Sequence, residues 1–179
     1  MNINTRPLKI MLTVFVILLV IESTRLLIGP RYWLNLSESE PVGLYTRETL
    51  HQPLNRGDMV LLKCPPGYEK YLYGRKWLPT GWPLFKTVAG LPGDTFCVSE
   101  KNLTLNGKQI GPVYAVDSRG RSLPVLRGCR TVRENHILAI ATGLKTSFDG
   151  RYFGDVPVSL IIGTVRPVLT FKEEGRGEE

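Results

Sequence analysis

The sequence predicts a mainly β protein that follows a single membrane helix at the N-terminus. Three observations predict this fold class. An apolar run begins at residue 10, short segments with alternating or β-branched residues recur from residue 59 onward, and Pro and Gly return roughly every eight to twelve residues between them. Of the 179 residues, about 150 follow the apolar run, which is enough for one compact domain with a hydrophobic core.

The N-terminal run has the properties of a membrane anchor. Residues 10–21 are apolar except for one Thr, and counting on to residue 28 gives about 19 residues, enough to cross a bilayer if Glu22 and Arg25 lie near the far interface. Basic side chains precede the run, so residues 1–9 are expected in the cytoplasm and the remainder outside it. A cleaved signal peptide is the alternative, but no small-x-small cleavage site follows, which favours an uncleaved anchor.

Short strands dominate the exported part, residues 31–171. Asn106-Gly107 lies between two alternating runs and predicts a type I′ hairpin, because both central residues of that turn take positive φ. The tail, residues 172–179, holds only charged residues and Gly and is expected to be solvated. The predicted strands cover residues 59–63, 85–89, 95–99, 103–105, 108–110, 137–141 and 161–165.

The net charge of +7 does not indicate a nucleic-acid partner. The basic residues are scattered singly, and no RNP, zinc-finger or helix-turn-helix pattern accompanies them. A basic surface suits anionic lipid headgroups equally well. The one local excess consists of Arg119, Arg121, Arg127, Arg130 and Arg133.

The choice of a catalytic base is narrow. His51 and His136 stand in no motif that pairs them with a nucleophile, and no C-x-x-C or H-E-x-x-H pattern predicts a metal site or a cofactor. A neutral Lys is another base, provided that burial lowers its pKa by several units. Lys86 follows the apolar residues 82–85, although a lone Lys in a strand ordinarily points to solvent.

A resemblance to type I signal peptidases decides in favour of Lys86. Residues 86–94, K-T-V-A-G-L-P-G-D, resemble the box around the family's catalytic Lys, and residues 35–45, N-L-S-E-S-E-P-V-G-L-Y, resemble the nucleophile box of its TraF-type conjugative-transfer branch. Residues 56–62, R-G-D-M-V-L-L, resemble the strand between them. Residues 147–154, S-F-D-G-R-Y-F-G, resemble the family's S-x-D-S-R-Y-x-G. The order and span of these four boxes make the resemblance specific, and it implies a signal-peptidase-like catalytic β-domain.

The resemblance implies a role for each matching residue. Ser39, two residues before Pro41, is the expected nucleophile, and Lys86 is the expected general base. The Ser37 hydroxyl and the Ser39 backbone N–H are expected to stabilise the oxyanion. Ser37 is the rival nucleophile, but it would put the Pro four residues downstream.

Three further residues are expected to support the site, and four positions depart from the family pattern. The supporting residues are Ser147, which would orient the Lys amine, and an Asp149–Arg151 ion pair behind it. Gly150 replaces a Ser, and Thr87 stands where Arg is common, which we expect to alter surface charge alone. Glu38 and Glu40 flank Ser39 and either favour a positively charged substrate or point to solvent.

Three cysteines, Cys64, Cys97 and Cys129, allow one disulfide in an oxidising compartment, and the residues alone do not pair them. The resemblance to the TraF-like branch implies a Cys97–Cys129 bridge with Cys64 free. It also implies that residues 95–140 form a reduced insertion in the catalytic domain.

The resemblance implies a serine endopeptidase of the bacterial inner membrane with its catalytic domain in the periplasm. The TraF-like box favours maturation of a propilin for plasmid conjugation, alongside other conjugative-transfer proteins, with water or the pilin's own amine resolving the acyl-enzyme. In the second case the product is a cyclic peptide. One alternative is a general type I signal peptidase that removes leader peptides from preproteins. The other is an inactive scaffold in a pilus or secretion complex.

Overall fold

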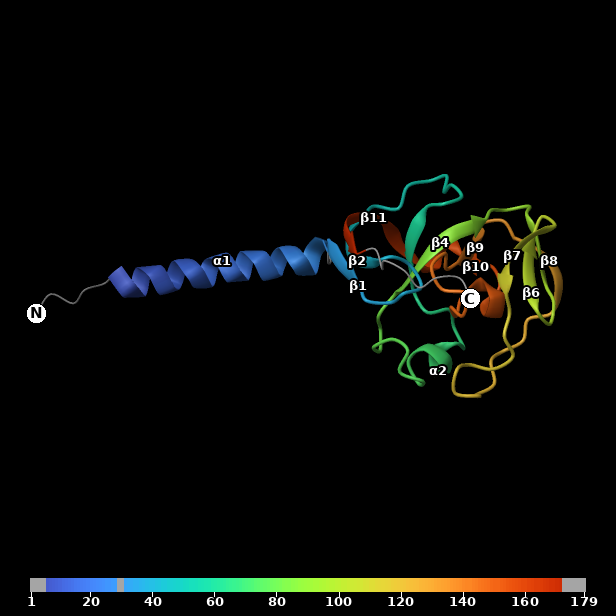
Figure 1. Ribbon diagram of the computed structural model, residues 1–179. Coiled ribbons are helices and arrows are strands. Elements are labelled where there is room, and N and C mark those ends of the chain that lie inside the picture. The colour runs from blue at the N-terminus through green and yellow to red at the C-terminus, as the bar shows by residue number, and fades with distance from the viewer. Residues whose placement is uncertain (1–5, 29–30, 172–179) are drawn as a thin grey trace, which may run out of the picture.

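The structure, a computed structural model, describes residues 6–28 and 31–171. Helix α1 (Arg6–Ile28) projects as a rod from a β-rich body (Figure 1). Its stretch Arg6–Thr24 has a mean hydropathy of 1.9 and no residue buried against the body, so the helix is long and apolar enough to cross a bilayer. Residues 1–5, the Gly29-Pro30 break and the charged tail at 172–179 lie outside the described residues.

The larger sheet has seven antiparallel strands and carries the residues of interest. Their spatial order is β1 (Tyr32–Asn35), β2 (Val42–Glu48), β11 (Ile161–Phe171), β3 (Met59–Leu62), β4 (Leu84–Gly90), β9 (His136–Ile140) and β10 (Val156–Pro157). The last strand of the chain, β11, inserts between β2 and β3 and pairs with both. It therefore joins the N-terminal hairpin to the rest of the sheet, so that the two ends of the described body lie side by side.

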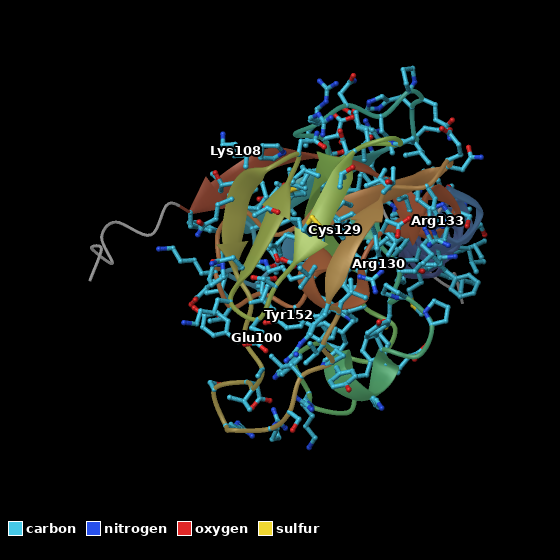
Figure 2. The ribbon with its side chains drawn as sticks, turned by 90° about the vertical axis from the view of Figure 1, so that its right-hand side faces the viewer. Glu100, Lys108, Cys129, Arg130, Arg133 and Tyr152 are labelled. Atoms are coloured by element: carbon cyan, nitrogen blue, oxygen red, sulfur yellow. A yellow bond between two sulfur atoms is a disulfide. The ribbon has the colours of Figure 1, made fainter. Side chains whose placement is uncertain are left out.

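The smaller sheet has four antiparallel strands in the order β7 (Lys108–Pro112), β6 (Asn102–Leu105), β5 (Thr95–Val98) and β8 (Gly128–Thr131). It lies on the side of the body away from α1 and faces the viewer in Figure 2. Cys97 and Cys129 are directly opposite each other on β5 and β8 and form a disulfide, in agreement with the expected pairing. Asn106 and Gly107 have φ values of 50° and 79°, which confirms the type I′ hairpin between β6 and β7.

The main hydrophobic core connects the two sheets. Val60 and Val88 of the larger sheet belong to the same buried cluster as Phe96 and Leu103 of the smaller one. A second buried cluster, formed by Tyr45, Leu61, Phe85 and Val165, packs on the opposite face of the larger sheet. Because side chains alternate between the faces of a strand, Lys86 points to the same side of β4 as Leu84 and Val88, into the main core.

The helices of residues 31–171 are short. Helices α2 (Glu69–Leu72) and α3 (Gly150–Phe153) have four residues each, and a 3-10 turn, η1 (Val158–Leu160), precedes β11. An aromatic cluster around Phe148 fills the space between α2 and α3. The rings that contact Phe148 belong to Tyr68, Tyr71, Trp77, Tyr152 and Phe153. This packing holds the residue next to Ser147 in place.

Candidate functional site

The turn between β1 and β2, residues 36–41, is held in shape by the buried side chain of Asn35. Its amide nitrogen donates to the carbonyl oxygens of Ser37, Glu40 and Pro41, each at 3.0 Å, and its amide oxygen accepts from the Ser37 N–H at 3.0 Å. One side chain thus satisfies four backbone groups that the turn leaves unpaired. Sequence reasoning missed this role of Asn35; the signal for it was an Asn directly before a Ser- and Pro-containing turn.

Ser37 and Ser39 contact each other at the centre of this turn. The Ser37 hydroxyl donates to Ser39 Oγ at 2.9 Å and accepts from the Ser39 N–H at 3.2 Å. The side chain of Ser39 is only 6% exposed, whereas Ser37 is half-buried. The two groups expected to stabilise an oxyanion, the Ser37 hydroxyl and the Ser39 amide, therefore lie next to the Ser39 oxygen.

Lys86 lies in the middle of β4, opposite Val60 of β3, and is 3% exposed. Its amine donates a hydrogen bond of 3.1 Å to Ser147 Oγ. Burial lowers the pKa of Lys86 below its ordinary value; the charges of Asp149 and Glu40 oppose this change and that of Arg151 adds to it. The outward orientation that is usual for a Lys in a strand does not apply here, and a deprotonated amine is the form that the surroundings favour.

Asp149 and Arg151 support the segment that carries Ser147. They form a buried ion pair with 3.2 Å between Asp149 Oδ1 and Arg151 Nε, as expected from the sequence. The Asp149 carboxylate also caps α3 through the Arg151 N–H and accepts from the Ala141 N–H at 2.9 Å. The Arg151 guanidinium donates to the carbonyl oxygen of Lys145. The pair therefore fixes both ends of residues 141–147.

The same segment touches the Ser39 turn directly. The Gly143 N–H donates to the carbonyl oxygen of Ser39 at 3.0 Å. A Cβ atom at residue 143 would lie 2.6 Å from the Glu38 carbonyl oxygen, so that only glycine allows this close approach. Ser39 and Ser147 are thereby tied to one another through backbone contacts.

Ser37, Ser39, Lys86 and Ser147 all line one groove of about 730 Å³. Its walls are mostly apolar and aromatic, which is typical of a site that binds an extended apolar segment. They include Leu34, Leu36, Leu72, Trp77, Trp82, Leu84, Phe85, Tyr114, Val116, Leu123, Leu144, Phe148 and Tyr152. Among the described residues, the Lys86 amine bonds to Ser147 and the Ser39 hydroxyl to Ser37, so Ser39 and Lys86 share the groove but not a hydrogen bond.

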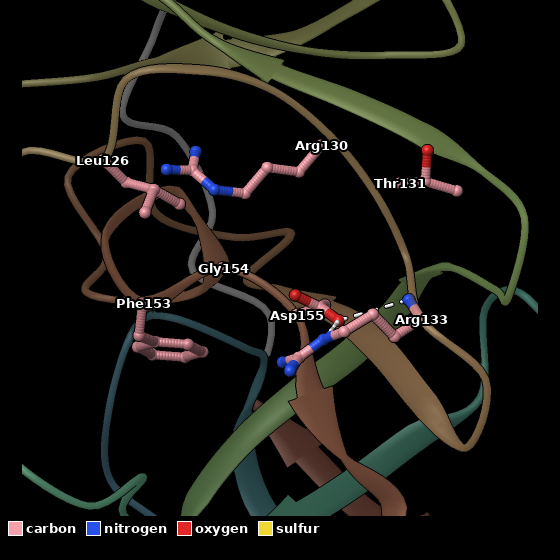
Figure 3. A pocket seen from close by; sticks show the side chains of 7 residues that line it. All are labelled: Leu126, Arg130, Thr131, Arg133, Phe153, Gly154 and Asp155. Atoms are coloured by element: carbon pink, nitrogen blue, oxygen red, sulfur yellow. Dashed lines mark hydrogen bonds and ion pairs between the residues drawn. The ribbon is translucent and has the colours of Figure 1, made fainter.

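A second hollow of about 510 Å³ lies at the smaller sheet (Figure 3). It is lined by Leu126, Arg130, Thr131, Arg133, Phe153, Gly154 and Asp155. Arg133 forms an ion pair with Asp155 across it at 2.9 Å. The hollow contains neither a buried base nor any residue that the sequence singled out for catalysis, so the groove with Ser39 and Lys86 is the candidate site.

Other side chains lie differently from their expected positions. Glu40 does not point to solvent: it is buried and hydrogen-bonded to Thr87, whereas Glu38 is exposed. Thr87 is half-buried, so its effect is not restricted to surface charge. His51 contacts Asp58, and His136 contacts the Glu134 carbonyl; neither His lines the groove.

Comparison with known proteins agrees with the motifs. The family described as "Signal peptidase, peptidase S26" matches residues 6–170. The conjugal transfer protein TraF of Agrobacterium fabrum is 36% identical over 150 residues, covering 78% of this chain and 83% of that protein. A plasmid transfer protein TraF of Escherichia coli is 32% identical over 148 residues, covering 76% and 82%. A signal peptidase I from Enterococcus faecalis superposes with a TM-score of 0.38 at 21% identity, over 65% of this chain and 98% of that one.

Proposed function

This chain belongs to the signal peptidase family, peptidase S26, and from that premise we propose that it is a serine endopeptidase with Ser39 as nucleophile and Lys86 as general base. The observation that carries the proposal is the burial of the Lys86 amine in the groove that also exposes the Ser39 hydroxyl. A buried amine loses its proton near neutral pH, which an exposed lysine does not. The sequence alone offers no other base beside Ser39.

The proposed reaction begins when neutral Lys86 removes the proton from Ser39 Oγ while that oxygen attacks a peptide carbonyl. Ser39 must turn from Ser37 toward the amine for this step, and Ser147 holds the amine in place. The Ser37 hydroxyl and the Ser39 N–H then donate to the oxyanion. Collapse of the intermediate leaves an acyl-enzyme, and protonated Lys86 gives its proton to the leaving amine.

The hydrogen bonds favour Ser39 over Ser37 as nucleophile. The Ser37 hydroxyl donates its proton to Ser39, so that proton is engaged, whereas the proton of Ser39 is available to a base. Ser39 also carries the N–H that would stabilise the developing charge, which places nucleophile and oxyanion donor in one residue. Both arguments agree with the spacing of Ser39 from Pro41.

The proposed substrate is the precursor of a pilin used in conjugative transfer. Two relatives named for conjugal or plasmid transfer support this choice, and the apolar groove suits the hydrophobic end of an exported precursor. Helix α1 would hold the groove at the inner membrane. The Cys97–Cys129 disulfide supports a periplasmic position for the β-domain, because disulfides persist in that compartment. Other conjugative-transfer proteins are its proposed neighbours.

Co-expression of the full chain with a pilin precursor from its own transfer system tests this function. We expect wild-type protein to shorten the precursor, and Ser39→Ala to leave it at full length, as read by intact mass spectrometry. A product one water lighter than the linear peptide indicates that the pilin amine resolved the acyl-enzyme. Cleavage of ordinary leader peptides without action on the pilin indicates a general signal peptidase. Identical masses with both proteins would contradict a peptidase and leave the scaffold role.

A further inference from the structure

Glu40, the residue after Ser39, is buried at the junction of three segments. Its side chain is 1% exposed. Oε1 accepts from the Thr87 hydroxyl at 2.9 Å and from the Thr142 N–H at 3.3 Å, and Oε2 contacts the Thr142 hydroxyl at 2.5 Å. A buried carboxyl group with three partners is costly to place and is fixed in position once it is there.

These partners belong to the segments that carry the proposed dyad. Thr87 follows Lys86 on β4, and Thr142 follows β9, in the segment that leads to Ser147. One carboxyl group therefore connects the Ser39 turn to the strand of the base and to the segment that orients it. The two positions where the sequence departs from the family pattern, Glu40 and Thr87, are partners in this contact.

The charge of Glu40 also acts on the Lys86 amine. Around Lys86, Glu40 and Asp149 favour the protonated amine, whereas Arg151 and burial disfavour it. The other titratable group near Glu40 is the Tyr45 hydroxyl on β2, whose pKa is raised by burial and by the Glu40 charge. Burial raises the pKa of Glu40 itself, and its bonds to the two threonines and the Lys86 charge oppose this.

We propose that Glu40 is a positioning residue, which clamps the Ser39 turn to the strand of Lys86 and places a negative charge beside the Lys86 amine. The inference rests on the proposed Ser39–Lys86 reaction. Its physical purpose follows from acid–base chemistry: an amine that burial makes too weak a base cannot accept the Ser39 proton efficiently. The carboxylate offsets part of the burial effect and keeps the amine basic enough.

Titration of Lys86 by NMR tests the charge without any substrate. Lysine side chains are labelled with 13C at Cε, and the Lys86 signal is assigned by its loss in Lys86→Met. In Glu40→Gln, which keeps the shape of the side chain, we expect the Lys86 midpoint to fall by about one pH unit, because an opposite charge is removed. Glu38→Gln is the matched control, since this exposed carboxylate flanks Ser39 on the other side and is expected to leave the midpoint unchanged.

The clamp is tested with Thr87→Val, which removes one hydrogen bond to Glu40 and keeps the branched shape. We expect kcat to fall about tenfold with KM nearly unchanged, and the acid limb of the rate profile to move to lower pH as Glu40 becomes harder to ionise. If Glu40→Gln does not fold, this variant carries the test, with the Lys86 midpoint as readout. A purely structural residue would change stability and leave that midpoint in place.

The two proposals fail in different ways. If Lys86 in the wild-type protein titrates near the ordinary lysine value, about 10.4, the proposed dyad itself is wrong. If Lys86 titrates well below that value and Glu40→Gln leaves its midpoint unchanged, the dyad stands and the role of Glu40 is overturned. A midpoint that moves equally in Glu38→Gln would also overturn it, because the effect would then be one of net charge.

Discussion

The Lys86 amine donates a 3.1 Å hydrogen bond to the hydroxyl of Ser147, a residue 61 positions further along the chain. Both side chains are buried, so the bond is shielded from water and fixes the direction of the amine. Ser147 is in turn held by the backbone contacts of residues 141–147 and by the Asp149–Arg151 pair behind it. The orientation of the base is thus set by a part of the chain far from it in sequence.

Replacing Ser147 with Ala is expected to lower kcat by about 10- to 100-fold, because one hydrogen bond to a buried amine is worth about 1–3 kcal/mol. KM should change little, since Ser147 orients the base and is not proposed to hold the substrate. Steady-state kinetics with a precursor peptide measures both constants. Ser99→Ala, an exposed serine beside the smaller sheet, serves as control. An unchanged kcat in Ser147→Ala would show that the bond does not orient the base.

The pH dependence of the rate follows from the state of Lys86. Only the neutral amine accepts a proton, so kcat/KM should rise with pH through the pKa of Lys86 and then level off. Burial lowers this pKa below its ordinary value of 10.5, so the rise is expected to end before pH 10. A profile from pH 5 to 10 on the full chain in detergent or bilayers measures it. A rate that still climbs tenfold per unit at pH 10 would contradict a buried base.

Lys86→Met is expected to abolish activity and to increase stability by about 1–4 kcal/mol near neutral pH, because an apolar side chain replaces a buried cation site. In the wild-type protein the unfolded chain binds more protons at this residue than the folded chain, so its stability rises with pH up to about 10.5. The difference between the two proteins should therefore shrink as pH increases. Urea unfolding at pH 7 and pH 10 measures it, and a constant difference would argue against a lowered pKa.

Removing the Cys97–Cys129 disulfide is expected to destabilise the β-domain by about 3–4 kcal/mol, since the bond closes a loop across a sequence separation of 32 residues. The bond lies between β5 and β8, and neither cysteine lines the groove, so kcat should stay within about twofold. Chemical unfolding of the double Cys→Ala variant provides the test, with Cys64→Ala, the free thiol, as control. Loss of activity in a folded double variant would mean that the smaller sheet shapes the groove.

The strands found from the sequence are those with a clear local pattern. The Asn106-Gly107 hairpin and the apolar strands β3, β4 and β9 carry their signals within a few residues. Strand β2 was missed because Gly43 breaks its pattern; the glycine is needed there, since a Cβ would lie 2.2 Å from the Leu169 carbonyl oxygen on β11. Strand β8 has four exposed residues and no alternation, so only its pairing with β5 defines it.

The site divides in the same way. Motifs identified Ser39, Lys86 and Ser147 as residue types in order, and the apolar neighbours of Lys86 pointed to its burial. The contacts of Glu40 could not be predicted, because its partner Thr142 lies 102 residues away and the pairing depends on how β9 meets the Ser39 turn. A glutamate beside a serine carries no local sign that it will be buried.

The most direct test of the account is to locate the acyl group on the enzyme. A peptide with an activated ester at the scissile position is mixed with the full chain, the reaction is quenched, and the modified residue is mapped by mass spectrometry. We expect the acyl group on Ser39, no adduct in Ser39→Ala, and in Ser37→Ala an adduct on Ser39 that forms about 100- to 1,000-fold more slowly. An adduct on Ser37, or one that persists in Ser39→Ala, would contradict Ser39 as the nucleophile.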